Sequence, residues 1–371
     1  NILNRWKPND PTKSLAAPVG VDKHQELFKL DLHEKFYGPH GLIAGMTGSG
    51  KSEFIITYIL SMALNYHPYE VSFVLIDYKG GGLTGAFENK ETGIKLPHLA
   101  GTITNLDTIE MNRSLASIQS ELRKRQRIFN AARDNLNEST IDIYKYQSLY
   151  RKGLVKQPVS HLFIISDEFA ELKDQRPEFM DQLISTARIG RSLGVHLILA
   201  TQKPAGVVND QIWSNSKFRV CLKVQDKSDS MDMIKCPDAA SLKNPGRFYL
   251  QVGYNELFAL GQAAWAGAQY YPTEKRKKKV DQSVNFLDNV GNYIKTFDTK
   301  QNDIVVESKG EEITNIVNYI VQTAKEENVS IPQLWLPRIP NMIYTEELKA
   351  KYNYQAVTNN INPIIGEYDD P

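Results

Sequence analysis

The sequence predicts an α/β fold in which helices flank a central, mainly parallel sheet. Apolar runs of strand length recur at residues 41–44, 71–76, 161–166 and 195–201, and segments with apolar residues at helical spacing lie between them. Strands that alternate with helices form βαβ units, in which the strands run parallel. These runs are apolar at nearly every position, which is typical of strands covered on both faces.

The first predicted strand leads into a glycine-rich turn that a helix follows at once. The strand covers residues 41–44, and apolar residues at helical spacing continue over residues 51–66 until Pro68 ends the pattern. The next strand, residues 71–76, is closed by Asp77. The glycine-rich turn therefore joins a buried strand to a helix.

Further strands and helices alternate through the middle of the chain. The glycine-rich residues 77–97 predict a loop, residues 102–104 a strand, and residues 107–130 a long basic amphipathic helix. The strand at residues 161–166 ends in an acidic pair, and a helix over residues 177–192 separates it from the next strand. This order extends the parallel sheet.

Beyond Gly246 the pattern changes to a hairpin. Residues 248–252 and 257–263 predict two antiparallel strands joined by a tight turn at residues 253–255. Residues 38–272 are therefore predicted to form one compact domain.

The two ends of the chain are predicted to be less regular. Residues 1–37 are rich in proline and polar residues and predict an N-terminal arm, with regular structure starting only after about residue 40. Residues 273–371 predict a linker region leading towards a following module. The basic run at residues 275–279 is interpreted as a solvated linker in preference to an anion site. One helix in this region has an apolar face that must dock on a surface, made of Ile313, Ile316, Val317, Ile320, Val321 and Ala324.

Composition excludes several classes of protein. The 371 residues are 41% hydrophobic and 23% charged, which argues against a disordered tail. Lys and Arg number 44 against 43 Asp and Glu, so the net charge of +1 gives no global attraction to nucleic acid. The two cysteines, Cys221 and Cys236, indicate a reducing compartment and are interpreted as packing residues.

The sequence also indicates an internal piece of a longer protein. No apolar run approaches the roughly 18 residues that cross a bilayer, and the chain opens on Asn1 without a signal pattern. A short likeness between residues 18–22 and 363–369 suggests that a second module begins where the chain stops.

The glycine-rich turn fits the pattern of a P-loop, which binds the phosphates of ATP. Its backbone N–H groups can cradle a phosphate chain, and the positive end of the following helix adds to the attraction. Lys51 is expected to reach the β- and γ-phosphates, and Ser52 to bind Mg²⁺. The predicted site consists of Gly45, Met46, Thr47, Gly48, Ser49, Gly50, Lys51 and Ser52.

Polar residues end two of the neighbouring predicted strands. Asp167 is expected to hold Mg²⁺ together with Ser52, and Glu168 to orient or deprotonate the water that attacks the γ-phosphate. A solvated pair of acids is the alternative, but two carboxylates after a buried run are costly without a cation. Thr201 and Gln202 end the next strand and are interpreted as a γ-phosphate sensor, because that strand is expected beside the P-loop.

An arginine from a neighbouring subunit often meets the charge that develops on the γ-phosphate. Arg125, in the basic segment at residues 123–127, is the candidate, with Arg188 and Arg191 as further possibilities. For each arginine the alternative is an exposed charge on a helix.

Taken together, these residues resemble the FtsK/SpoIIIE family of motor ATPases. The resemblance covers about residues 38–272 and implies a RecA-like P-loop NTPase fold. The matching segments are residues 45–52, 77–81, 96–99, 121–126, 167–168, 190–192 and 200–202. Within the family the chain is most similar to the tandem-ATPase motors of type VII secretion systems, through its segments LAAPVG, GPHGLIAG and DYKGGG.

The resemblance implies a place and partners for the chain. It implies a module at the cytoplasmic face of a membrane-anchored protein, with the membrane part upstream of Asn1, further ATPase modules in the same chain, and a homo-hexamer. It also implies that the substrates are secreted helical-hairpin proteins with a C-terminal export signal, and that other membrane components of the secretion system are partners. Because its nucleotide motifs are intact, the chain is expected to be the first, active module. The resemblance aligns the basic segment near Arg125 with the trans-acting arginine of the family, and Arg123 and Lys124 leave the register of that alignment open.

Two other functions stay open from the sequence. A double-stranded DNA translocase of the same family would need a basic channel, and the near-neutral charge and the absence of a recognisable helix-turn-helix pattern weigh against it, so DNA is not expected as a partner. A regulatory module that binds nucleotide with little turnover is the second alternative.

Overall fold

A computed structural model describes most of the chain. It covers residues 2–77, 82–89, 91–104, 108–204, 206, 208, 210–254, 256–272, 284–297, 308–335, 342–355, 363–364 and 366. The basic run at residues 275–279 and residues 78–81 of the DYKGGG segment lie outside the described residues. None of the helices in the described ranges is long and apolar enough to cross a membrane.

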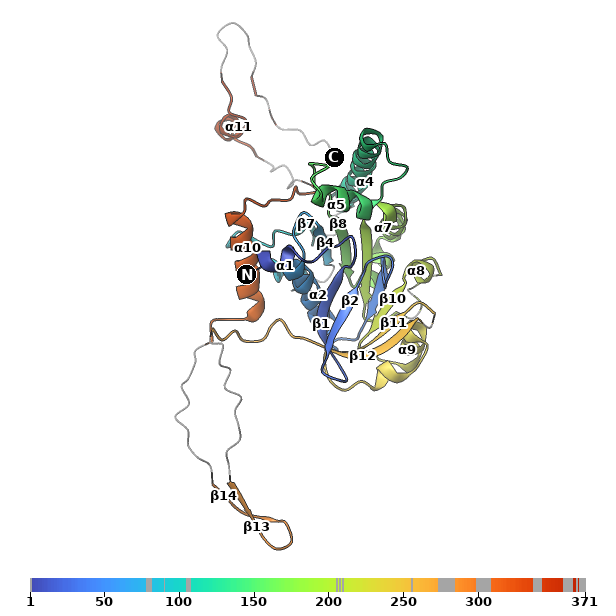
Figure 1. Cartoon of the computed structure of the whole chain (residues 1–371), viewed down its shortest axis with the longest axis vertical. Coiled ribbons are helices and arrows are strands. Elements are labelled where there is room, and N and C mark those ends of the chain that lie inside the picture. Colours follow the sequence, from blue (N-terminus) through green and yellow to red (C-terminus); the bar gives the residue numbers. More distant parts are fainter. Residues whose placement is uncertain are drawn as a thin grey trace.

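Ten strands of the described chain form one sheet (Figure 1). Six of them run parallel, five of which the sequence predicted, and their spatial order is β10–β3–β9–β8–β4–β7. Their bounds are Phe218–Cys221 for β10, Gly41–Ala44 for β3, Val195–Thr201 for β9, His161–Asp167 for β8, Val71–Asp77 for β4 and Leu99–Ile103 for β7. The predicted α/β fold with a mainly parallel sheet is confirmed.

Four antiparallel strands extend the sheet beyond β10. They follow in the order β11, β12, β1, β2, with bounds Arg247–Val252, Leu257–Ala263, Ala16–Asp22 and Leu27–Asp31. Strands β11 and β12 form the hairpin predicted from the sequence. The described residues also contain two small two-stranded sheets. One consists of β5 (Glu88–Asn89) and β6 (Ile94–Lys95), and the other of β13 (Val284–Leu287) and β14 (Tyr293–Phe297).

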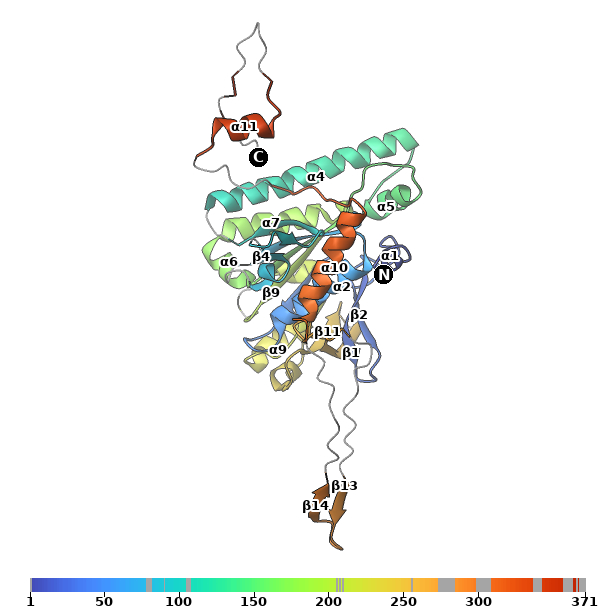
Figure 2. The same ribbon diagram turned by 90° about the vertical axis from the view of Figure 1, so that its left-hand side faces the viewer.

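Helices cover both faces of the sheet (Figure 2). Side chains alternate along β4, so Phe73 and Leu75 face one apolar core, and Val74 and Ile76 face the other. The first core is closed by α1 (Leu3–Trp6), α2 (Lys51–Asn65) and α10 (Glu312–Glu326), and the second by α4 (Thr108–Leu136), α5 (Ile143–Arg151), α6 (Phe169–Gln175), α7 (Pro177–Ile189) and α9 (Lys227–Ile234). The short elements are α3 (Gly82–Gly85), η1 (Arg191–Leu193), α8 (Asp210–Asn215), η2 (Asp238–Ser241) and α11 (Thr345–Lys351).

The prediction that regular structure starts only after residue 40 is wrong. The Trp6 side chain of α1 is buried, and its indole N–H donates to the Ala63 carbonyl at 3.0 Å. Strand β1 pairs with β12 and buries Ala17 and Val19 completely. Pro18 is tolerated in β1 because the pairing with β2 shifts register there. The N-terminal arm is therefore part of the sheet.

The C-terminal region packs on the same domain over two stretches. The apolar face of α10 docks on α2, as expected, and buries Ile313, Val317 and Ile320. Residues 330–335 then follow the edge strand β7, where the Leu334 N–H donates to the Ala100 carbonyl at 2.9 Å. The loop predicted at residues 77–97 contains the short elements α3, β5 and β6 in its described part.

Candidate nucleotide-binding site

The P-loop lies at the carboxyl end of β3, directly before α2. Gly48 and Gly50 have φ angles of 78° and 89°, a left-handed conformation that favours glycine. A side chain at Gly50 would also place its Cβ only 2.7 Å from the backbone nitrogen of Gly246. That nitrogen donates to the Ser49 carbonyl at 2.8 Å, so the lead into β11 fixes the shape of the loop.

The order of the strands brings the predicted site residues together. In the sheet β3 is followed by β9 and then β8, and Ala44 pairs with Thr201. The Gly45 N–H donates to the Thr201 carbonyl at 3.1 Å. The ends of β9 and β8 therefore lie next to the P-loop.

Lys51 joins the P-loop to the acidic pair. Its Nζ contacts the Asp167 carboxylate and lies 3.6 Å from Glu168 Oε2. The Lys51 side chain is only 6% exposed, so these two carboxylates compensate a buried cation. The same lysine can turn its charge towards phosphate groups in the loop.

Ser52 and Asp167 offer a hydroxyl and a carboxylate for a metal ion. Ser52 Oγ donates to Asp167 Oδ2 at 3.1 Å. Mg²⁺ prefers hard oxygen ligands and is usually bound through one or two protein groups together with phosphates and water. The donor set of Ser52 and Asp167 therefore fits Mg²⁺.

Glu168 is held in a strained but well-supported position. Its backbone is left-handed, with φ 57° and ψ 51°, which is costly for a residue with a side chain. The carboxylate is buried, and its Oε1 accepts hydrogen bonds from Thr201 Oγ1 and from the Gln202 N–H, both at 3.1 Å. Thr47 Oγ1 in turn donates to Gln202 Oε1 at 3.0 Å. Thr201 and Gln202 thus connect Glu168 to the P-loop.

Asp77 lies beside this site but has a different role. It pairs in register with Asp167 across β4 and β8, and it is 3% exposed. Its Oδ2 accepts the backbone N–H of Leu83 at 2.8 Å, and that of Thr84 at 3.4 Å. These bonds join the end of β4 to α3, so the carboxylate fixes the position of that helix.

The structure places Arg125 away from the candidate site. The guanidinium donates to Glu121 at 3.0 Å and to the carbonyls of Ser160 and Leu193 at 2.8 and 2.9 Å. Ser160 and Leu193 precede β8 and β9, so Arg125 lies at the amino ends of the strands, whereas the P-loop lies at a carboxyl end. The side chain is 3% exposed. In this chain Arg125 therefore makes structural contacts, and its trans-acting role, which needs an accessible guanidinium, stays a prediction.

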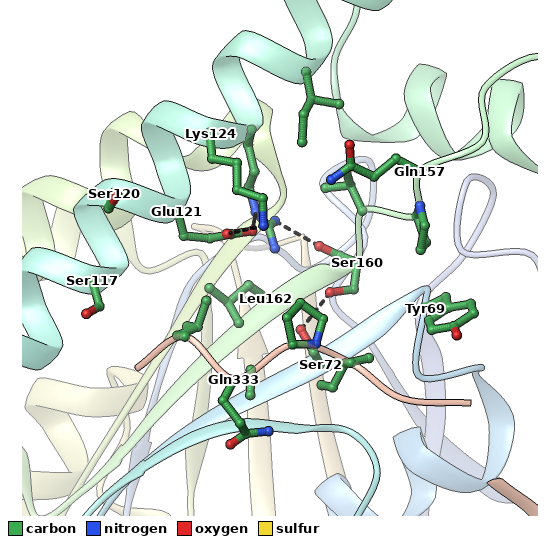
Figure 3. Close-up of a pocket in the computed structure, with 18 of the residues that line it drawn as sticks. Tyr69, Ser72, Ser117, Ser120, Glu121, Lys124, Gln157, Ser160, Leu162 and Gln333 are labelled. Atoms are coloured by element: carbon green, nitrogen blue, oxygen red, sulfur yellow. Dashed lines mark hydrogen bonds and ion pairs between the residues drawn. The ribbon is translucent and has the colours of Figure 1, made fainter. Parts of the chain in front are cut away.

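A cavity of about 560 Å³ opens beside Arg125, between α4, the starts of β4 and β8, and residues 330–335 (Figure 3). It lies at the amino ends of the strands and is separate from the nucleotide site. Arg188 and Arg191 line a second cavity, at the start of β3, and Arg191 pairs with Glu34 at 2.5 Å. None of these three arginines lies at the edge of the sheet that carries the P-loop.

Comparison with known proteins identifies the class of this fold and site. Residues 2–206 match the model of the FtsK/SpoIIIE family. This match spans more than half of the chain and includes the P-loop and the acidic pair, so the chain belongs to the FtsK/SpoIIIE family and has its P-loop ATPase fold.

Particular relatives are similar over nearly the whole chain. The type VII secretion system protein EssC of Staphylococcus aureus (strain NCTC 8325) is 48% identical over 94% of this chain, which spans 23% of that relative. The ESX secretion system protein EccC of Geobacillus thermodenitrificans is 46% identical over 91% of this chain and 22% of the relative. The chain thus spans about a quarter of the length of these curated relatives.

Solved structures agree with the fold. The cytoplasmic domain of the type VII secretion ATPase EccC of Thermomonospora curvata is 27% identical with a TM-score of 0.70, over 91% of this chain and 34% of that chain. ATPases 2 and 3 of the same EccC, in complex with a signal sequence peptide, give a TM-score of 0.60 at 21% identity, over 91% of this chain and 52% of that one. The second likeness supports the fold alone.

Proposed function

We propose that this chain binds and hydrolyses ATP as a motor module of a type VII protein secretion system. The observation that carries the proposal is the joint placement of Lys51, Ser52, Asp167 and Glu168 around the P-loop. The similarity to EssC and EccC supports the secretion role and leaves the DNA translocase with less support.

The proposed mechanism is phosphoryl transfer to water. The backbone N–H groups of the P-loop and the Lys51 ammonium bind and orient the phosphates. Ser52 and Asp167 hold Mg²⁺, which neutralises charge on the phosphates when it is bound. Glu168 accepts a proton from the attacking water, and Thr201 and Gln202 hold its carboxylate in place. Positioning and electrostatics supply most of the rate.

A glutamine at position 168 tests this assignment. Glu168→Gln keeps the size of the side chain and removes its capacity to accept a proton. We expect ATP binding close to that of the native chain and hydrolysis at least about a hundredfold slower. Binding is measured by fluorescence titration with an ATP analogue and hydrolysis by phosphate release. The matched control is Glu178→Gln, on the exposed start of α7. Unchanged turnover in Glu168→Gln would remove Glu168 from its role.

The domain organisation is part of the proposal. We assign residues 38–272 to the ATPase domain and residues 273–371 to a region leading to a following ATPase module of the same chain. The length of the relatives leaves room for further modules, because the matched part is only 23% and 22% of these relatives. The pairing of β1 with β12 supports adding residues 1–37 to the domain. We also propose that the chain is the first, active module, since its nucleotide motifs are intact.

The cellular context and the assembly are proposed from the relatives. We infer a location at the cytoplasmic face of the membrane and a homo-hexamer, with other secretion-system membrane components as partners. Secreted helical-hairpin proteins with a C-terminal export signal are the proposed substrates. An ATPase assay across protein concentration tests the assembly. A rate per subunit that rises steeply with concentration supports a site completed by a neighbour, and a rate near zero throughout supports the regulatory alternative.

A further inference from the structure

A second cavity lies at the other end of β3 from the P-loop. It has a volume of about 560 Å³, within the range of about 300–1,000 Å³ typical of small-molecule sites. His40, which lines it, directly precedes β3, whereas Gly45 directly follows that strand. The four residues of β3 therefore separate this cavity from the nucleotide site.

The wall of this cavity is strongly basic. Five cationic side chains line it against one carboxylate, that of Glu256. Two of the five have a carboxylate partner, since Arg191 pairs with Glu34 and Lys217 pairs with Glu256 at 3.1 Å. The remaining three, Arg188, Arg219 and Lys235, make no ion pair with any residue that the structure describes.

Two of these three cations gather on one indole ring. The Arg219 guanidinium lies 4.6 Å from the centre of the Trp213 ring, and the Lys235 ammonium lies 5.7 Å from it. Such contacts hold a cation in place without neutralising its charge. Burial lowers the pKa of Arg219, which indicates that its positive charge is poorly solvated. An anion would relieve this cost.

Two buried polar atoms in the wall lack partners among the described residues. The Leu197 N–H donates to His40 Nδ1 at 2.9 Å, so a neutral His40 carries its proton on Nε2, and this donor has no acceptor. Gln251 is directly opposite Arg219 across β10 and β11, and its Oε1 is also unpaired. Buried polar groups normally have a partner, and a bound ligand or water can supply one.

We infer that this cavity binds a small polyanion, a ligand with two or more phosphate or carboxylate groups. Arg188, Arg219 and Lys235 supply charge, and the planar guanidinium of arginine can donate two parallel hydrogen bonds to a carboxylate or a phosphate group. His40 adds a buried N–H donor that fixes the orientation of the ligand, whereas the unpaired Gln251 Oε1 is an acceptor and suits a bound water beside it. The inference is independent of the proposed ATPase function, because the two sites share no residue.

Calorimetric titration of the full chain tests this site with two probes. Pyrophosphate represents phosphate ligands and citrate represents carboxylate ligands. The titrations use the Lys51→Ala background, which weakens binding at the P-loop. The exposed double variant Arg188→Gln with Lys235→Gln should lower the affinity for the bound probe at least about tenfold, because charge-assisted bonds are lost. Lys243→Gln, an exposed lysine outside the cavity, is the matched control and should change nothing.

Each result decides the question. The inference is supported when a probe binds and the double variant weakens that binding. Binding of pyrophosphate alone then identifies a phosphate ligand, and binding of citrate alone identifies a carboxylate ligand. Binding of both probes identifies a site that takes either oxyanion. The inference is overturned if neither probe binds at millimolar concentration, or if the double variant binds as tightly as its background. Arg219→Gln provides a second test of the cavity. Its fold is checked in the chain that keeps the native Lys51, where Arg219→Gln should leave the ATP affinity unchanged.

Discussion

Glu168 combines a left-handed backbone with a buried carboxylate at the end of β8. Strain of this kind persists only where the surroundings enforce it, and it is common at functional sites. Here the hydroxyl of Thr201 and the backbone N–H of Gln202 both donate to Oε1. The sequence predicted that Thr201 and Gln202 belong to the site, but not that they orient Glu168, because hydrogen-bond partners depend on the spacing of β8 and β9.

Thr201→Val should therefore impair turnover more than binding. The change keeps the shape of the side chain and removes the hydroxyl that donates to Glu168. A hydrogen bond to a charged group is worth about 1.5–3 kcal/mol, so we expect kcat to fall about tenfold or more with ATP affinity within about twofold. Steady-state ATPase kinetics measure the first and fluorescence titration the second.

Thr323→Val is the matched control for this prediction. It removes the hydrogen bond that the Thr323 hydroxyl donates to the Tyr319 carbonyl in α10, away from the nucleotide site. Both kcat and the ATP affinity should stay unchanged. An equal loss of ATP affinity and turnover in Thr201→Val would instead place Thr201 in contact with the nucleotide.

At the scale of elements, burial decides which parts the sequence could predict. Strands β4, β8 and β9 are apolar at nearly every position, and their bounds agree with the predicted runs within a residue. Strand β10 was missed because it has only four residues and includes Arg219. Strand β1 was missed because Pro18 and Gly20 indicate a loop, whereas a register shift in the pairing with β2 accommodates Pro18 and pairing with β12 compensates for Gly20. Long-range pairing of this kind has no local signal.

Helix α4 is fastened to the sheet by Arg125, which binds the residues before β8 and β9. Arg125→Ala would leave two carbonyls and the Glu121 carboxylate without this partner. Breaking a buried charged pair typically costs about 3–5 kcal/mol, so we expect the free energy of unfolding to fall by about 3 kcal/mol. Urea denaturation measures it. Arg123→Ala, at an exposed position of the same helix, should cost less than about 0.5 kcal/mol.

The same variants separate the two roles considered for Arg125. A stable Arg125→Ala chain that loses activity only when assembled would support the trans-acting role. A destabilised chain with proportionate loss of activity supports the structural one.

At the scale of the whole molecule, buried neutral histidines link stability to pH. Burial lowers the pKa of His98 and His196 to about 3, and that of His161 well below its usual range. The Pro39 carbonyl can only accept, so His196 donates to it through Nδ1 and accepts from His161 Nδ1 at 2.9 Å. This chain of bonds needs a neutral His196, because its Nε2 must accept, and protonation of His161 would bury a charge at Nε2, which has no partner among the described residues.

Acidification should therefore destabilise the fold. Below the unfolded pKa of about 6.5 the unfolded chain binds protons that the folded chain does not, so stability falls as pH falls. Each histidine contributes about 1 kcal/mol of this loss at pH 5.5. Burial raises the pKa of the Glu70 carboxyl to about 7, although the charge of Arg151 acts to lower it. Below pH 7 the folded chain therefore binds a proton at Glu70 that the unfolded chain does not bind. This proton stabilises the fold by about as much as one buried histidine destabilises it.

Thermal unfolding between pH 7.5 and 5.5 measures this dependence. His98→Gln, whose amide can keep the bond to the Tyr66 carbonyl, should reduce the slope, and the exposed His24→Gln should not. A melting temperature that stays constant over this range would contradict the account.

The most direct test of the nucleotide site is a crystal structure with a non-hydrolysable ATP analogue and Mn²⁺, which replaces Mg²⁺ and can be located by its anomalous scattering. We predict one strong peak beside Ser52 Oγ on the side of Asp167, with the phosphates along residues 45–52. A metal and nucleotide bound elsewhere, for example in the basic cavity of Arg188 and Arg219, would contradict the account.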